Sequence, residues 1–430
     1  MKTKLKQIFY DMSHQRVVTW VTLTGTALTM FLIIGVIIIE QVGVIPFAPE
    51  NCRPRLMVGA NIDMRSLDGE SSSSGSMSNT TARRLYGALD GVEVTSYMTE
   101  PSTENVKGET GKAFEASHRR TDAAFWRLFD HTLTEGRIYT DDEGKSKTRV
   151  AVITESTARN LFGGVREALG STFMLDHLNW RVIGVVKDHS KMATTASADI
   201  FTPLDPDSPS TSTWWSELSP YYGEVRVALR LADGVSYDHI REQVKARYAA
   251  LATEVHPTGF RPEYHEGPYD QETIATCDIA WSNVTPDRNK TKRIYTVIYV
   301  LLLLVPAINL SAMLQSRLRR RVSELGVRRA FGCTRARIIT DIVTENLIVT
   351  AMGALAGFIL AVAVLSIYPG VLDTVYQTGD ATPPLNAMLN WRVILAALAG
   401  CFLLNLISAA VPAWHASRLS PVNAINQERQ

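Results

Sequence analysis

Four long apolar runs are the feature that most constrains how this 430-residue chain can fold. Each run reaches the roughly 20 helical residues that are needed to cross a hydrocarbon core, and charged residues or a proline lie at its ends. One such run alone also fits a buried helix of a water-soluble protein, but four together predict a membrane protein. We expect transmembrane helices at residues 17–39, 294–315, 344–368 and 392–412.

The first run has a second interpretation, because Lys2, Lys4 and Lys6 precede it as they would precede the core of a signal peptide. The run is longer than such cores, however, and bulky residues rather than a small-x-small cleavage site follow it. We therefore expect an uncleaved anchor. Apolar residues at helical spacing within 1–16 predict a helix in the cytoplasmic interface ahead of it.

The basic residues set the orientation, because short loops that are rich in Lys and Arg stay in the cytoplasm. The segment that follows the second run carries eight arginines, whereas residues 369–391 contain no Lys or Arg. We expect cytoplasmic segments at 316–343 and 413–430, an outer loop at 369–391, and both termini in the cytoplasm. Residues 40–293 are then a large domain outside the cytoplasm, between the first and second membrane helices.

The outer segment, residues 40–293, alternates between strand-like and helix-like patterns, which predicts a mixed α/β domain. The serine-rich stretch Ser71–Ser78 and the segment Asp205–Ser212 are predicted as flexible loops. The expected strands are Arg149–Ile153, Thr172–Leu175, Trp180–Val186 and Glu224–Leu231, and the expected helices are Asp122–Phe129, Glu155–Phe162 and Tyr237–Val255.

The outer segment contains no recognisable catalytic constellation, such as a Gly-x-Ser-x-Gly elbow or a His-Glu-x-x-His zinc helix. Gly108–Ala113 has the wrong glycine spacing for a phosphate loop. We expect no catalytic, cofactor or metal site in this chain, and the net charge of +1 gives no reason to expect nucleic acid as a partner. One local cluster lacks the spacing of a metal site, and we interpret it as solvated surface: Glu254, His256, Glu263, His265 and Glu266.

Two residue pairs are candidates for structural roles. Cys52 follows the first membrane helix and Cys277 precedes the second, so a disulfide between them is a candidate tie between the two connecting segments. Gly353 and Gly357 have the small-x-x-x-small spacing that lets membrane helices approach closely. The glycines serve either packing within one subunit or a seam between two copies.

The cytoplasmic segment 316–343 predicts an elbow of two helices. Glu324 lies one helical turn from Arg320 and from Arg328, which suits a solvent-exposed helix. Gly332 is a stop signal for that helix, and Thr334 is suited to cap the next one. The elbow either holds anionic lipid or docks a cytoplasmic partner.

Three motifs in register resemble the MacB/FtsX-type ABC transporter permease family, over nearly the whole chain. They are Glu324-Leu325-Gly326-Val327-Arg328-Arg329-Ala330-Phe331-Gly332-Cys333, the C-terminal Pro412-Ala413-Trp414-His415-Ala416-Ser417-Arg418-Leu419-Ser420-Pro421-Val422-Asn423-Ala424-Ile425, and an outer-domain signature made of Glu135-Gly136-Arg137, Val150–Ile153, Leu161-Phe162-Gly163 and Val182–Asp188. Cys333 stands where the family usually has Ala, and residues 193–219, including Trp214-Trp215, match nothing in it.

The resemblance implies a non-catalytic inner-membrane permease that pairs with an identical or a second permease and recruits a separate ABC ATP-binding subunit. ATP-Mg is then bound by that partner, whose hydrolysis cycle moves the outer domain to export or extract an envelope substrate. Glu324, Gly326, Arg328 and Gly332 fall in the ATPase-coupling elbow, although Glu324 also fits a purely intrahelical pairing. The resemblance leaves open the substrate and a periplasmic adaptor, and it implies contact with membrane lipid.

Two other function classes compete with this one. A membrane-anchored receptor that signals through the arginine-rich elbow has the same architecture and differs only in its partner. A membrane-anchored enzyme is disfavoured by the missing catalytic constellation.

Overall fold

The computed structural model of the chain describes residues 16–108, 113–205, 216–276, 285–290, 292–302 and 331–367, together with a few positions of 304–327 and 395–406. The chain divides into two compact units. One unit contains the helix α12 (Arg335–Ile367) and the helix α2 (Arg16–Val42) as far as Ile39. The other unit is the outer domain, which is built mainly from Glu40–Arg288.

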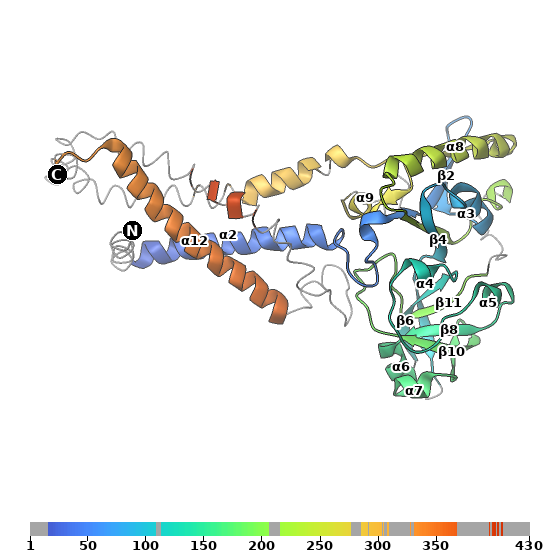
Figure 1. The fold of residues 1–430 in the computed structure, drawn as a ribbon. Helices are drawn as coiled ribbons and strands as arrows, with labels where there is room; N and C mark the ends of the chain where they lie inside the picture. Colours follow the sequence, from blue (N-terminus) through green and yellow to red (C-terminus); the bar gives the residue numbers. More distant parts are fainter. Residues whose placement is uncertain are drawn as a thin grey trace. The chain divides into compact units, whose positions relative to one another are not determined.

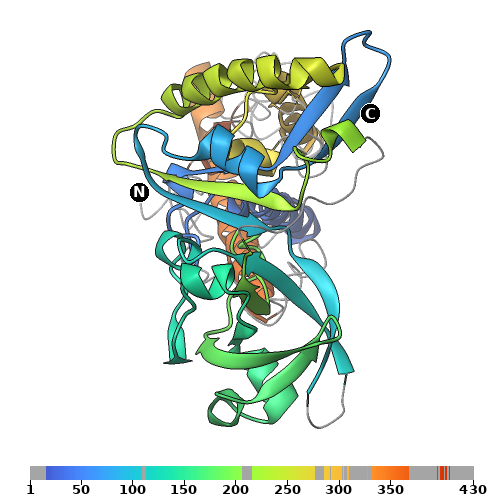
Figure 2. The ribbon, with the colours of Figure 1, turned by 90° about the vertical axis from the view of Figure 1, so that its right-hand side faces the viewer.

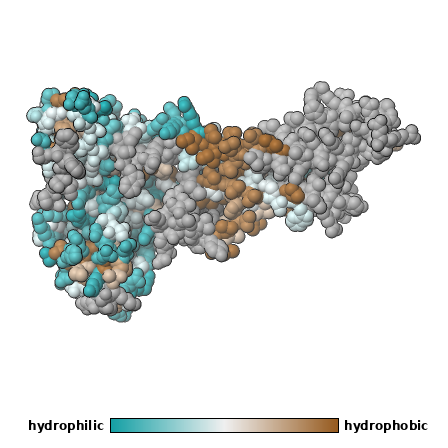
Figure 3. Space-filling model, turned by 180° about the vertical axis from the view of Figure 1, so that it is seen from behind, coloured by the Kyte–Doolittle hydropathy of each residue, from teal (hydrophilic) through white to brown (hydrophobic). Residues whose placement is uncertain are grey.

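Two helices among the described residues are long and apolar enough to cross a membrane. The apolar part of α2 covers Thr19–Ile38, and that of α12 covers Ala336–Val364. Large apolar side chains on both helices face outward, and this part of the molecule carries hydrophobic surface, whereas the surface of the outer domain is mostly hydrophilic (Figure 3). Half of the predicted span 294–315 and most of the span 392–412 lie outside the described residues, so a count of four spans stays a prediction.

The outer domain has two lobes (Figure 2). In the barrel lobe, six strands pair in a closed ring, because β11 pairs with both β8 and β6. The ring runs through β6 (Ala113–Thr121), β5 (Ser102–Lys107), β9 (Thr172–Leu175), β10 (Leu178–Val186), β8 (Val150–Thr154) and β11 (Ile200–Pro203). The short strand β7 (Leu133–Gly136) pairs with β10.

Short helices complete the barrel lobe: α4 (Phe125–Leu128), α5 (Asp141–Lys145), α6 (Glu155–Phe162) and α7 (Val165–Ala168). Ala158, Leu161 and Ala168 of α6 and α7 belong to the same buried cluster as strand residues such as Ala116 and Val182. These two helices therefore close one end of the apolar interior of the lobe, at the bottom of Figure 1.

The other lobe contains the first strand of the domain, and we call it the first lobe. It continues the same sheet through β4 (Val92–Thr99), β12 (Val225–Leu231), β1 (Leu56–Gly59) and β14 (Tyr269–Asp270). It adds a small sheet of β13 (Phe260–Glu263), β2 (Asn61–Ser66) and β3 (Ser72–Ser76), and the helices α3 (Asn79–Tyr86), α8 (Tyr237–Val255) and α9 (Gln271–Thr276). The lobes join where β4 pairs with β6, with Met98 opposite Thr121. The first lobe has its own core, so the domain has two apolar centres.

Local sequence signals explain where the helices begin and end. Thr154 accepts a hydrogen bond from the Thr157 backbone N–H at the start of α6, and Gly163 ends that helix in the left-handed conformation. Ser236 caps α8 in the same way. The sequence-predicted bounds of α6, α8 and β9 are confirmed to the residue, and those of β8, β10 and β12 within two residues.

Two predicted elements are wrong, in both cases because distant partners override local composition. Ser71–Ser78 is mostly strand rather than loop, since β3 pairs with β2 and the Tyr222 hydroxyl donates to the Ser73 carbonyl at 2.8 Å. The helix expected at Asp122–Phe129 shrinks to the single turn α4. The Asp122 side chain accepts hydrogen bonds from β4, at Ser96 and Tyr97, and this holds the start of the segment outside the helix.

Other expectations fall on residues that the structure does not describe. These are the interfacial helix of residues 1–16, except Arg16, and the loop Asp205–Ser212, except Asp205. They also include Trp214-Trp215, the elbow residues 316–326 and 328–330, and the segments 369–391 and 413–430.

An aromatic and histidine cluster fills the barrel lobe beside α4. The His131 imidazole stacks on Phe125 at 5.5 Å between ring centroids and meets His189 at 4.8 Å. Burial, followed by the nearby His189 and Arg119, holds the pKa of His131 well below its usual 6.5. His131 is therefore neutral in the folded chain across the physiological range of pH.

This cluster predicts acid sensitivity of the outer domain. Below pH 6.5 the unfolded chain binds a proton at His131 but the folded chain does not, so falling pH favours the unfolded state. We expect His131→Phe to reduce the fall in thermal unfolding midpoint between pH 7.5 and pH 5. The matched control is His256→Phe at an exposed position. Equal pH dependence in the wild type and in His131→Phe would contradict the assignment.

Candidate functional site

A buried ion pair anchors the segment that leaves α2 to the outer domain. The Arg53 Nε donates to the Glu50 carboxylate at 2.6 Å, and the two side chains are 1% and 0% exposed. Arg53 also donates to the carbonyls of Ile45 and Met192 at 3.1 and 2.7 Å, and its guanidinium lies over the Phe47 ring. A buried charge pair is tolerated only when its remaining hydrogen-bonding capacity is filled, as it is here.

The partner of this ion pair is the segment between β10 and β11, which we call the latch loop (residues 187–199). The other Glu50 oxygen accepts from the backbone N–H groups of Thr195 and Ala196, both at 2.8 Å. Arg119 of β6 donates to the carbonyls of Thr194 and Thr195. The latch loop has no regular secondary structure, so these charged side chains satisfy backbone groups that a strand ladder would otherwise satisfy.

The entry and exit segments of the outer domain meet at the latch loop. Gln271, the first residue of α9 on the exit side, donates from its amide to the Thr195 hydroxyl at 3.4 Å. On the entry side, a Cβ placed on Gly43 would lie 2.6 Å from the Ala275 Cβ. A displacement of either connecting segment therefore acts on the same loop of the barrel lobe.

The helix pair α2 and α12 makes a close contact at two glycines. A Cβ added to Gly353 would lie 2.7 Å from the Thr26 Cβ, and one added to Gly357 would lie 2.9 Å from the Met30 Cβ and still closer to the Ala27 carbonyl oxygen. The two helices cross in Figure 1. Both candidate packing glycines thus lie against α2 of the same chain, where only hydrogen fits.

The end of the predicted elbow is described from Phe331 onward. Gly332 has φ +89° and lies in a turn, and the Thr334 hydroxyl accepts from the Arg337 backbone N–H at 3.4 Å at the start of α12. The predicted cap is therefore confirmed, and Gly332 has the left-handed conformation that commonly follows a helix end, although the helix predicted before it lies outside the described residues. Glu324, Gly326 and Arg328 lie outside the described residues, so their coupling role stays a prediction.

The candidate disulfide also stays a prediction, because Cys277 lies outside the described residues. Cys52 is buried beside Glu50, and burial, reinforced by the negative charge of Glu50, raises the pKa of its thiol to about 11. As a thiol, Cys52 is thus unreactive at neutral pH.

The acidic and histidine residues that the sequence grouped near 254–266 do not form one cluster in the structure. Glu254 pairs with Arg84, while His265 meets Asp63 at 3.1 Å and Glu263 at 3.7 Å. Within the part of the chain that the structure describes, no three His, Cys, Asp or Glu side chains are placed to hold a metal ion.

Sequence reasoning missed Glu50 and Arg53. A Glu and an Arg three residues apart are typical of a solvated surface pair. The only local signal for burial is their position between apolar residues and prolines such as Pro49 and Pro54. The latch loop buries the pair, and it is distant in sequence, because Met192 lies 139 residues after Arg53.

Comparison with known proteins identifies relatives for both units. The family model of the MacB-like periplasmic core domain matches residues 19–247, and that of the FtsX-like permease C-terminal domain matches residues 296–421. The pyoverdine export ATP-binding/permease protein of Pseudomonas savastanoi pv. phaseolicola is 24% identical over 71% of this chain and 42% of its own length. The macrolide export ATP-binding/permease protein of Shewanella sp. (strain ANA-3) is 23% identical over 99% of this chain and 60% of its own length.

The chain therefore spans about half the length of these curated relatives. Among solved structures, the periplasmic region of MacB from Actinobacillus actinomycetemcomitans aligns with 52% of this chain and 93% of that chain, at 19% identity and a TM-score of 0.34.

The anchoring ion pair predicts a large loss of stability when one partner is removed. Glu50→Ala leaves the Arg53 charge buried and two backbone N–H groups without an acceptor, which costs about 3–5 kcal/mol of unfolding free energy. We expect a clearly lower thermal unfolding midpoint for the purified chain. Glu70→Ala, at an exposed position of the same domain, serves as the control, and equal midpoints for the two variants would contradict this role.

The glycine contact predicts that a branched side chain separates the helices. Gly357→Val places methyl groups against the Ala27 carbonyl and should cost about 1–3 kcal/mol, as overpacking does in other well-packed interfaces. Gly35→Val is the matched control, since a Cβ at Gly35 meets nothing within 4 Å among the described residues. Thermal unfolding in detergent measures both variants, and a destabilisation of similar size in both would argue against the contact.

Proposed function

This chain belongs to the family of MacB/FtsX-type ABC transporter permeases, and we propose that it is a permease subunit that converts ATP hydrolysis in a separate subunit into movement of its outer domain. The work done is export or extraction of an envelope substrate. In this proposal the chain is a non-catalytic, multi-pass protein of the inner membrane with four spans and cytoplasmic termini. The match of both family models, in the order expected for such a permease, is the observation that carries the proposal.

The contacts around the latch loop support transmission of movement rather than a pore. Both connecting segments of the outer domain contact this loop, through Glu50 on the entry side and Gln271 on the exit side. A buried, fully hydrogen-bonded ion pair resists separation, because breaking it exposes uncompensated charge to a low-dielectric interior. Displacements of the connecting segments are thus passed to the barrel lobe instead of being absorbed by a flexible joint.

The cytoplasmic side of the proposal rests on the elbow. The turn at Gly332 is followed at once by the capped helix α12, and the helix predicted before this turn would be suited to pass a push into the membrane. We propose that Glu324, Gly326, Arg328 and Gly332 form the contact with an ABC ATP-binding subunit, which holds ATP-Mg. Two permease copies, identical or different, would pair around two such subunits, with membrane lipid around them.

The test is purification of the tagged chain in mild detergent together with its ATP-binding subunit. We expect co-purification and ATP hydrolysis, and we expect Glu324→Lys to lower hydrolysis by about tenfold or more, because it places a positive charge where a partner arginine would bind. Glu115→Lys makes the same charge reversal on an exposed strand position of the outer domain and should leave hydrolysis unchanged.

Two results would count against the proposal in different ways. Normal association and hydrolysis in the Glu324→Lys complex would remove Glu324 from the coupling contact. Absence of any ATP-binding-cassette subunit from the purified material would overturn the transporter assignment and favour the receptor alternative.

A further inference from the structure

A cavity of about 730 Å³ lies at the junction of the two lobes of the outer domain. Its walls come from β5, β6 and β11, from the turn between β9 and β10, from the segment around α5, and from Ser76, Gly223 and Glu224 of the first lobe. A cavity of this size is typical of small-ligand sites, which occur preferentially between lobes and in the mouths of β-barrels.

Strand alternation explains why this cavity is the open mouth of the barrel. On β6, Ala116 belongs to the apolar cluster of the lobe, and His118 and Arg120, which share its face, line the cavity. On β5, Val106 belongs to the same cluster and Glu104 lines the cavity. The face that forms the apolar core at the α6–α7 end thus becomes polar at the opposite end.

The charges in this mouth do not balance. Arg120 pairs with Glu224, and Asp176, Asp205 and Glu104 also act on its charge from nearby. Lys147 pairs with Asp205 at 2.9 Å, which leaves Glu104 and Asp176 without an ion-pair partner among the described residues. His118 contributes no charge at neutral pH, since burial and the neighbouring Arg120 lower its pKa to about 4.

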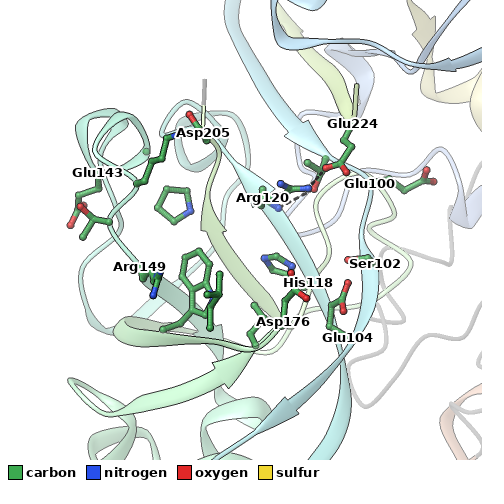
Figure 4. Close-up of a pocket in the computed structure, with 18 of the residues that line it drawn as sticks. Glu100, Ser102, Glu104, His118, Arg120, Glu143, Arg149, Asp176, Asp205 and Glu224 are labelled. Carbon is green, nitrogen blue, oxygen red and sulfur yellow. Dashed lines mark hydrogen bonds and ion pairs between the residues drawn. The ribbon is translucent and has the colours of Figure 1, made fainter. Parts of the chain in front are cut away.

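Glu104 and Asp176, the two carboxylates without an ion-pair partner, lie on the same side of the cavity. Arg149 also lines the cavity and has no ion-pair partner among the described residues. Figure 4 shows Glu104, His118 and Asp176 near one another, with Arg149 and Glu143 on the other side. Asp176 is held in place by a two-residue turn in which Asp176 and His177 both have positive φ, at 48° and 59°. The carboxylate therefore projects from a rigid hairpin rather than from a flexible loop.

Apolar groups stand beside these carboxylates. Leu175, Leu178, Trp180 and Pro203 line the same cavity. Trp180 lines the cavity, and an indole ring attracts cations through its face. The described residues provide no three-ligand set for a metal ion, so the cavity favours an organic cation over an inorganic one.

We propose that this barrel-mouth cavity is a binding site for a small organic cation that carries amino groups and an apolar portion, held by Glu104 and Asp176 and by the Trp180 ring. The site is separate from the coupling contacts and is tested without nucleotide. A failure here therefore leaves the permease assignment standing, and the loss of that assignment would not remove the cavity.

The test is calorimetric titration of the full-length chain in detergent with spermidine, at low and at moderate salt. We expect saturable binding that weakens with salt and falls by about tenfold or more in the double variant Glu104→Gln/Asp176→Asn. Glu115→Gln/Glu242→Gln removes two exposed carboxylates outside the cavity, and it should bind spermidine as the wild type does.

Several results would overturn the proposal. These are no saturable binding of spermidine, equal weakening in the two double variants, or equally tight binding of the dianion glutarate. If the double variant does not fold, the spermidine affinity of the single variant Glu104→Gln, at a half-exposed position, serves as the test, and an affinity equal to that of the wild type would overturn the proposal. Binding of Ca²⁺ at the same site with equal affinity would also overturn the assignment to an organic cation.

Discussion

The buried ion pair between Glu50 and Arg53 is the interaction on which the outer domain depends. The latch loop is buried but has no strand ladder, so its backbone groups need partners from elsewhere. Glu50 accepts from two of its N–H groups, Arg53 donates to the Met192 carbonyl, and Arg119 donates to the carbonyls of Thr194 and Thr195. The charges of Glu50 and Arg53 are then hydrogen-bonded on all sides, which offsets the cost of taking them out of water. The same contacts determine where the chain enters the domain.

The two lobes have separate cores and a small contact with each other. β4 and β6 pair at one register position, Met98 opposite Thr121, and each lobe packs around a core of its own. Bridges between separate cores are weaker points than the cores themselves, because fewer apolar groups are lost when they open. The latch loop belongs to the barrel lobe, whereas Gln271 lies in the first lobe and donates to it. A displacement of the connecting segments would therefore first change the contacts between the lobes.

Much of the fold follows from local sequence, and the rest depends on contacts between distant residues. The caps at Thr154 and Ser236 and the left-handed Gly163 are local signals of helix ends. The bounds of α6 and α8 could therefore be predicted from the sequence. The serine-rich strand β3 could not, since its hydrogen bonds come from β2. The closure of the barrel through β11 and β6 joins residues about 80 positions apart and leaves no periodic signal. The resemblance to a permease family supplied the function class, but nothing in the sequence showed that Glu50 and Arg53 are buried.

The position of the barrel-mouth cavity connects the latch loop to a ligand. The cavity is lined by both lobes, so its shape depends on how the lobes are placed relative to each other. The latch loop ends where β11 begins, and Pro203 at the other end of β11 lines the cavity. A cation that binds one arrangement of the lobes more tightly favours that arrangement. By thermodynamic reciprocity, a displacement of the connecting segments that favours the same arrangement raises the affinity for the cation. In the proposed permease, this coupling would tie the nucleotide cycle to binding and release at the barrel mouth without any passage of the ligand between the membrane helices.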